Sequence, residues 1–170
     1  MKSRAPAADF AEAAERHLDD VHAYLVYLTG DRGVAEDLTA ETFARALERW
    51  GRYDPRRGSA RTWLCQLARS TALDHFRAEE RRRRREGRYA AAELHETTEP
   101  TFGDGLSPAL ERALARLSAA EREVVVLRVV LELDSESAAR VLGISPTACS
   151  TRLSRALARL EKEVSAGVAA

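Results

Sequence analysis

The apolar positions of the first half of the chain recur at helical spacing. Apolar side chains follow one another every three or four residues over 10–28 and again over 34–50, which predicts two amphipathic helices. Asp31 stands directly before the second stretch, where its carboxylate suits a helix N-cap. After a loop at 51–60, a third helix is expected to begin near Ser59 and to run on into five consecutive arginines. The apolar face of the second helix is expected to hold Val34, Leu38, Ala46, Leu47 and Trp50.

Periodicity fades after the arginines and resumes near residue 110. The stretch "HETTEPTFGDGLSP" (95–108) is polar, acidic and rich in turn formers, so it is typical of a linker. Ser118 and Glu121 form a capping-box pattern at the start of a helix. The following "VVVLRVVLEL" (124–133) is valine-rich and suits a strand by propensity, but its helical surroundings favour a buried helix.

The segment "SESAARVLGISPTACSTRLSRALARL" (135–160) has the pattern of a helix-turn-helix. Gly143 stands where a positive φ is needed, and Ser145 and Pro146 suit the N-cap and the first position of the second helix. One face of that helix is apolar and is expected to hold Cys149, Leu153, Ala156, Leu157 and Leu160. The opposite face carries Thr147, Ser150, Thr151, Arg152, Ser154 and Arg155, small polar side chains and arginines that suit a major groove. The alternative is an ordinary helical hairpin with a solvated polar face.

These patterns predict an all-α protein of two small helical domains. The first domain is expected at 10–86 and the second at 109–164, joined by a flexible acidic linker at 87–108. Residues 165–170 are expected to form a disordered tail.

Charge is distributed unevenly along a chain whose formal net charge is zero. Residues 51–88 carry 12 basic and 5 acidic side chains, whereas residues 1–50 carry 6 and 10. Ion pairs Glu79–Arg83 and Glu80–Arg84 at helical spacing would explain part of the arginine run. The other interpretation is contact with a polyanion, because arginines continue along one face of the same helix, namely Arg77, Arg81, Arg84 and Arg88.

Several classes of function find no support. No apolar stretch is long enough to cross a membrane, no signal peptide is visible, and Cys65 and Cys149 match no metal spacing. The four histidines form no metal site, and neither a glycine-rich phosphate loop nor a nucleophile–base signature is present. We therefore expect a cytoplasmic protein that is not an enzyme and that holds no metal or cofactor.

Two blocks of sequence resemble one family, the extracytoplasmic-function (ECF) sigma factors of bacterial RNA polymerase. The first block is "AEDLTAETFARALERW" (35–50) with "RTWLCQLARSTALDHFR" (61–77). The second is "LSAAEREVVVLRVVLELDSESAARVLGISPTACSTRLSRALARL" (117–160). The resemblance covers most of residues 10–163, and it implies sigma regions 2 and 4 in the expected order.

The resemblance implies a dissociable subunit that directs RNA polymerase to promoters. The first domain would bind the β′ clamp helices of the core enzyme and melt the minus-ten element, and the second would recognise the minus-thirty-five element and touch the β flap. Many relatives are held by an anti-sigma factor. The implied polymerase-binding residues are Asp37, Glu41 and Glu48. The implied minus-ten residues are Tyr53, Arg56, Arg57, Ser70, Arg77, Arg81 and Arg84, with Tyr53 in a loop that captures a flipped base.

Two other classes of protein remain open at this point. A stand-alone helix-turn-helix regulator would bind duplex DNA without polymerase, but residues 111–170 carry 9 basic and 8 acidic side chains, which is little positive charge for that task. A helical enzyme or scaffold has no motif in its favour. The tail ending Ala169-Ala170 resembles those recognised by Clp-type proteases, which adds such a protease as an expected partner; the alternative is a tail without consequence.

Overall fold

The structure is a computed structural model that describes residues 7–87 and 100–168. These residues are helical with connecting loops, and no strand occurs among them, which confirms the all-α prediction. No helix in this part of the chain is both long and apolar enough to cross a membrane. Arg88 and the tail residues Ala169 and Ala170 lie outside the described residues.

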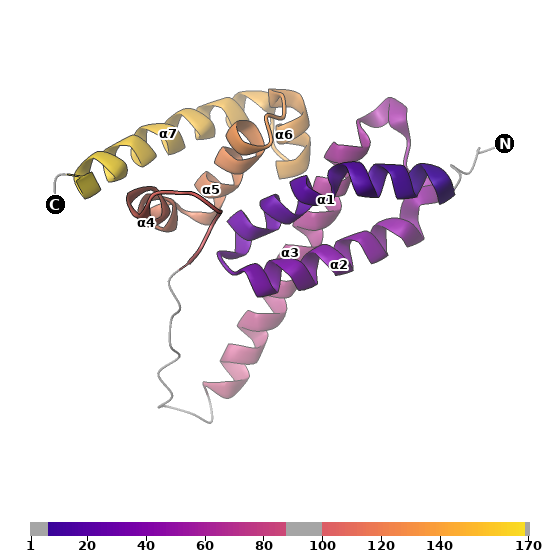
Figure 1. Cartoon of the computed structure of the whole chain (residues 1–170), viewed down its shortest axis with the longest axis horizontal. Helices are drawn as coiled ribbons and strands as arrows, with labels where there is room; N and C mark the ends of the chain where they lie inside the picture. The colour runs from indigo at the N-terminus through magenta and orange to yellow at the C-terminus, as the bar shows by residue number, and fades with distance from the viewer. Residues whose placement is uncertain (1–6, 88–99, 169–170) are drawn as a thin grey trace.

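The N-terminal half forms a unit of three helices (Figure 1), in which α1, α2 and α3 pack against one another. The loop between α2 and α3 holds two short 3-10 turns. The elements are α1 (Ala7–Thr29), α2 (Arg32–Arg49), η1 (Trp50–Arg52), η2 (Pro55–Arg57) and α3 (Ala60–Glu86). As expected, α3 continues through the whole arginine run.

The C-terminal half forms a second unit, in which α4, α5 and α6 each pack against the long α7 (Figure 1). Its elements are α4 (Pro108–Arg116), α5 (Ala119–Val125), the π-helix η3 (Val126–Val130), α6 (Ser135–Leu142) and α7 (Pro146–Val168). The pair α6 and α7 is the helix-turn-helix that the sequence predicts.

Local capping signals predicted from the sequence are confirmed. The Asp31 carboxylate accepts a hydrogen bond from the N–H of Val34 at 3.0 Å. Ser118 and Glu121 form a reciprocal capping box, in which each side chain accepts from the other residue's N–H. These caps satisfy N–H groups that would otherwise lack a partner at the helix start, so they define where α2 and α5 begin.

The turn of the helix-turn-helix also follows its sequence signals. Gly143 ends α6 in the left-handed conformation, with φ at 67°, which a side chain would disfavour. The hydroxyl of Ser145 accepts a hydrogen bond from the N–H of Ala148 at 3.1 Å, and Pro146 is the first residue of α7.

The valine-rich stretch 124–133 is helical as far as Val130 and contains no strand, so the strand alternative is wrong. Its first part is buried, but Val129 and Val130 at the end of η3 are 50% and 41% exposed. The chain then leaves the helix, and Leu131 and Leu133 turn back into the core.

Two other expected core positions are exposed because they lie at the edge of their apolar faces: Leu47 is 56% exposed and Leu157 is 39% exposed.

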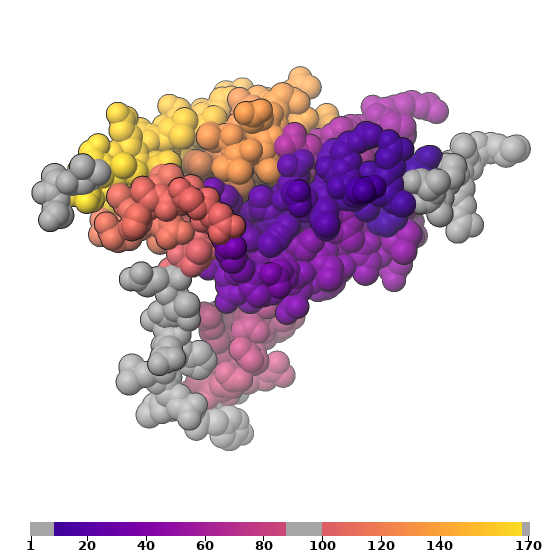
Figure 2. All heavy atoms as spheres, in the orientation of Figure 1, coloured from indigo at the N-terminus to yellow at the C-terminus, as the bar shows by residue number. Residues whose placement is uncertain are grey.

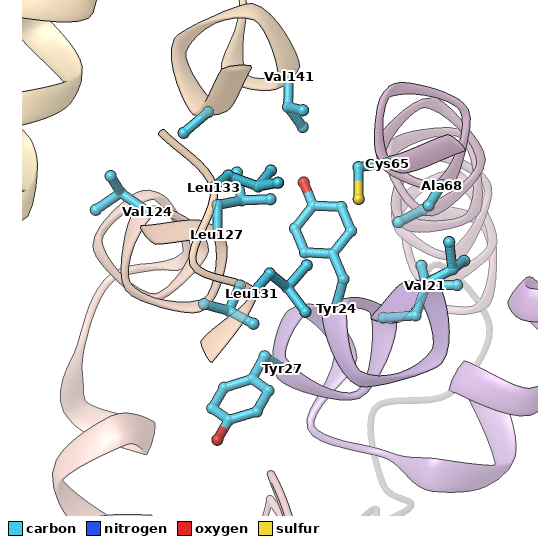
Figure 3. Close-up of a cluster of buried hydrophobic side chains, with 14 of the residues drawn as sticks. Val21, Tyr24, Tyr27, Cys65, Ala68, Val124, Leu127, Leu131, Leu133 and Val141 are labelled. Carbon is cyan, nitrogen blue, oxygen red and sulfur yellow. The ribbon is translucent and has the colours of Figure 1, made fainter. Parts of the chain in front are cut away.

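One hydrophobic core is shared by the two units. Tyr24 of α1 is fully buried, and its ring lies between Cys65 and Ala68 of α3 on one side and Leu127 and Leu133 of the C-terminal unit on the other (Figure 3). In the space-filling view the C-terminal helices lie directly against the N-terminal unit (Figure 2). The two units therefore pack as one body in this structure.

The described end of the predicted linker is anchored to both units. Phe102 is 1% exposed and stacks on Tyr27 with ring centroids 6.0 Å apart, while the Arg122 guanidinium lies 4.9 Å from its ring centre. The N–H of Thr101 donates to the carbonyl of Gly30 at 2.9 Å. A single aromatic residue in a polar stretch was the only sequence signal for this anchor.

Candidate nucleic-acid interface

Four of the six predicted minus-thirty-five residues lie together on α7. Thr147, Thr151, Arg152 and Arg155 line a shallow groove of about 580 Å³ that also includes Ser118, the N-cap of α5. Except for partly buried Arg152, these side chains are exposed, as is Ser154 nearby. The groove presents hydroxyls and guanidinium groups, which donate to phosphates and to base edges.

Contacts within the motif hold this face in place. The buried side of α7 is fixed by Cys149 and Ala156, both of which have no exposed surface. Ser150 lies 3.2 Å from the hydroxyl of Ser135 on α6, so it contacts the neighbouring helix as well as lying on the predicted face. The N–H of Ser137 donates to Asp134 at 2.8 Å, which caps α6 and lowers the pKa of this carboxyl below its usual value.

The predicted base-capturing loop is built on an aromatic cluster. Trp50 is buried and stacks on Tyr53 with ring centroids 4.8 Å apart, and Phe10 and Trp63 meet Trp50 edge-on. The Tyr53 hydroxyl donates to the carbonyl of Gly58 at 3.2 Å. Burial raises the pKa of Tyr53, so its hydroxyl remains a donor at neutral pH.

The loop and the start of α3 form a cleft of about 480 Å³. Tyr53 and Arg57 line this cleft together, whereas Arg56 is exposed outside it. Trp63 and Gln66 complete its wall and were not assigned to the site from sequence. Their position on the first turns of α3, directly after the loop, was the signal that could have found them. A flat aromatic wall beside an arginine suits a base stacked next to its phosphate.

A second, smaller cleft of about 250 Å³ follows along α3. Ser70 and Arg77 line it, together with Arg69. Arg77 also lies 3.6 Å from Asp74, but it remains mostly exposed. The structure thus places the predicted α3 residues in one row that continues from the loop cleft.

The arginine run at the end of α3 is exposed. Arg84 pairs with Glu80 at 2.8 Å as expected, but the predicted pair Glu79–Arg83 is wrong, because Glu79 pairs with Arg82 at 2.8 Å, three residues away. Exposed pairs of this kind contribute at most about 1 kcal/mol each. Arg81 is exposed as well, so this end of α3 keeps guanidinium groups available for phosphates.

A third surface lies along α2. Asp37, Glu41 and Glu48 are exposed on one stripe of the helix, and Glu41 is paired with Arg45. Leu47, next to Glu48 in the sequence, is also exposed, so α2 presents both acidic and apolar side chains to solvent. Such a mixture is typical of a protein–protein contact rather than of a nucleic-acid contact. Among the described residues, no group of three or more histidine, cysteine or acidic side chains is arranged to hold a metal ion.

Two parts of the chain match known family models, and most of its length matches known proteins. Residues 13–82 match the model of Sigma-70 region 2, and residues 107–160 match that of Sigma-70 region 4. The chain is 35% identical over 166 residues to the ECF RNA polymerase sigma factor BldN of Streptomyces coelicolor, covering 94% of this chain and 63% of that protein. It is 37% identical over 139 residues to the probable RNA polymerase sigma-C factor of Mycobacterium bovis, covering 81% of this chain and 73% of that protein.

Solved structures share the fold. The sigma factor RpoE of Bartonella quintana, in complex with the anti-sigma factor NepR, superposes with a TM-score of 0.77 at 23% identity, over 92% of this chain and 97% of that one. CnrH in complex with the cytosolic domain of CnrY superposes with a TM-score of 0.69 at 23% identity, over 95% of this chain and 91% of that one. With regions 2 and 4 in order and close relatives over most of its length, the chain belongs to the ECF family of RNA polymerase sigma factors.

Proposed function

We propose that this protein directs core RNA polymerase to specific promoters and initiates transcription there as an ECF sigma factor. The observation that carries the proposal is that one chain holds two different DNA-suited surfaces, an aromatic cleft followed by arginines and a helix-turn-helix face. One suits a single strand and the other suits a duplex, and promoter opening requires both.

The residues divide between the two tasks. In the proposed 10–86 domain, Tyr53 and Arg57 receive a flipped base, while Ser70 and Arg77 follow the strand along α3. Arg56, Arg81 and Arg84 contact phosphates, which position the protein without reading sequence. In the proposed 109–164 domain, the minus-thirty-five face of α7 enters the major groove. Its residues are Thr147, Ser150, Thr151, Arg152, Ser154 and Arg155.

The acidic stripe of α2 is proposed to bind the core enzyme at its β′ clamp helices. Asp37, Glu41 and Glu48 are exposed, and Leu47 of the same helix is exposed too, which supports a protein partner. The C-terminal unit is proposed to meet the β flap. In this function the chain works in the cytoplasm and catalyses no reaction itself, since polymerisation belongs to the core enzyme.

An anti-sigma factor is a further proposed partner. The two similar solved structures are both complexes, one with NepR and one with CnrY, and this chain has the same fold over more than nine tenths of its length. Exposed apolar side chains, among them Leu18, Leu47 and Val129, provide surface that a helical partner would cover.

Run-off transcription with purified core polymerase across genomic promoters tests the main proposal. We expect specific transcripts only when this chain is added. No transcript at any promoter, with no association with the core enzyme, would overturn the proposal. Tight sequence-specific binding to duplex DNA without polymerase would favour the stand-alone regulator instead.

A charge-reversal variant tests the polymerase surface. Asp37→Lys, Glu41→Lys and Glu48→Lys together should abolish co-purification with the core enzyme, because the reversed charges would no longer complement the surface that the acidic stripe is proposed to bind. Glu161→Lys on the exposed side of α7 is the matched control and should bind normally. Equal binding by both variants would show that α2 is not the contact.

A further inference from the structure

Two clefts of the proposed minus-ten surface are bordered by the protein's own C-terminal unit. Arg140 of α6 forms part of the wall of the loop cleft, and its Nη1 atom is 2.7 Å from where a Cβ at Gly58 would stand. The side-chain amide of Gln66 donates to the carbonyl of Arg140 at 3.2 Å. A guanidinium group therefore lies at the loop where the base of a melted strand is proposed to enter.

The second cleft on α3 is bordered by the same helix. Val141 of α6 lines it opposite Ser70 and Arg77. Figure 1 shows α6 beside the first half of α3, and the two helices pack directly against each other. Each cleft that is proposed to hold the melted strand therefore has one side chain of α6 in its lining, Arg140 in the loop cleft and Val141 in the second cleft.

A buried polar cluster joins the two units beneath this cover. The hydroxyl of Tyr24 donates to Oε1 of Glu123 at 2.6 Å, and Nε of Arg69 donates to the same atom at 2.7 Å. Tyr24 and Arg69 belong to α1 and α3, whereas Glu123 belongs to α5. The Glu123 side chain is only 8% exposed, and the surrounding interface is apolar.

The chemistry of this cluster suits an interface that opens. A carboxylate loses its free energy of hydration when it is buried, and its hydrogen bonds to buried partners compensate for only part of that loss. When the units separate, water solvates Glu123 and Arg69 again, so separation costs less than it would for a wholly apolar interface of the same size. Arg69 also lines the second cleft, so separation frees its guanidinium on the strand-binding surface.

We infer that the free chain is self-inhibited: α6 covers the strand-binding clefts, and the Tyr24–Glu123–Arg69 cluster is the latch that holds it there. This inference rests on the proposed function. In the closed state Arg69 is paired with Glu123 instead of with a DNA phosphate, and the side chain of Arg140 takes up part of the loop cleft. The recognition face of α7 stays exposed, so the latch restrains capture of a melted strand and leaves contact with duplex DNA free.

A cross-link tests whether closure inhibits. Gln66→Cys with Arg140→Cys places one thiol on each side of the interface, while the native Cys65 and Cys149 are buried and burial raises the pKa of Cys65 to about 12, which keeps it unreactive. Arg116→Cys with Glu163→Cys is the matched control, because that ion pair, at 2.7 Å, lies within the C-terminal unit. In each variant the two introduced cysteines are joined with a short bis-maleimide in one experiment and with a reducible disulfide linker in another.

The expected result is rapid cross-linking of both pairs in the free chain. Because Gln66 and Arg140 both line the loop cleft, the linked pair is compared with the same pair capped by N-ethylmaleimide, which fills the cleft without joining the units. Only the Gln66→Cys/Arg140→Cys link should abolish binding of a fluorescein-labelled single-stranded DNA of mixed sequence and promoter opening by the holoenzyme, and cleaving the disulfide linker should return both to the level of the unlinked pair. Full activity in the linked state would overturn the inference. Failure of this pair to cross-link would overturn it too, and since linking needs neither polymerase nor DNA, that outcome is separate from failure of the proposed function.

Opening variants test the latch in the opposite direction. Tyr24→Phe with Glu123→Gln keeps the shape of both side chains but removes the ion pair and one hydrogen bond, and Arg140→Ala removes the cover of the loop cleft. Each should tighten binding of the same single-stranded DNA by about three- to tenfold, since a minor open population weakens apparent affinity in proportion. Binding to duplex DNA should not change. Unchanged or weaker single-strand binding, in variants with wild-type circular dichroism, would contradict the latch.

Discussion

The two proposed DNA surfaces of this protein differ in how they are built and in how open they are. The α7 face is one side of a regular helix, and most of its side chains are exposed. The minus-ten surface combines a loop of two short turns, an aromatic cluster and one face of α3, and α6 covers part of it. The first surface follows from local sequence, whereas the second exists only after distant segments have met.

This difference explains where regulation can act. A surface on a regular helix is complete once that helix has its cap and its buried side. A surface assembled from α1, the loop and α3 depends on tertiary contacts such as Phe10 on Trp50, so a change in packing can close or expose it. Four experiments test this comparison.

The largest effect is expected at the base of the minus-ten loop. Trp50→Ala removes the buried ring against which Phe10, Tyr53 and Trp63 pack, so the free energy of unfolding should fall by about 3–5 kcal/mol. Urea denaturation measures this loss. Trp63→Ala, at a half-buried position, should cost less, and an equal loss at both positions would show that Trp50 does not centre the cluster.

The recognition face should respond in DNA binding rather than in stability. Arg152→Ala and Arg155→Ala should each weaken recognition of the upstream promoter element by about 1–3 kcal/mol if they contact base edges. Footprinting of the holoenzyme at that element measures the effect. Lys162→Ala, on the same helix beyond the groove, is the control, and footprints alike in all three variants would reject this face.

A smaller effect is expected at the turn of the helix-turn-helix. Ser145→Ala removes the hydroxyl that accepts from the N–H of Ala148, which should cost about 1 kcal/mol of stability. Ser145→Asn can still cap and should retain most of it. Thermal unfolding compares the two, and equal midpoints would mean that the cap is not needed to position α7.

The smallest effect is expected on the free energy of unfolding at acidic pH. The N–H of Ser137 lowers the pKa of Asp134 from its usual 3.8, so the stability that this carboxylate contributes is present above that value and is lost as pH falls through the lowered one. Asp134→Asn keeps an oxygen that can cap the helix, but its amide is not protonated in this pH range. Its unfolding free energy should therefore fall less between neutral pH and about pH 3 than that of the wild type; parallel curves would contradict this.

Much of the local structure could be predicted, and the errors have a common cause. The caps of Asp31, Ser118 and Ser145 were predictable because each depends on residues within three positions. Leu47 was placed wrongly because periodicity cannot tell the centre of an apolar face from its edge. The anchor at Phe102 was missed because it depends on Tyr27 and Arg122, which are distant in sequence.

By itself, the sequence determined the helices, their caps, the helix-turn-helix and the family, because backbone hydrogen bonds and side-chain periodicity act over a few residues. Only the tertiary structure decided that Tyr24 and Glu123, 99 positions apart, share a buried hydrogen bond, and that α6 lies over α3. Burial of a charged group depends on every segment packed around it, and no local pattern encodes which segments those will be.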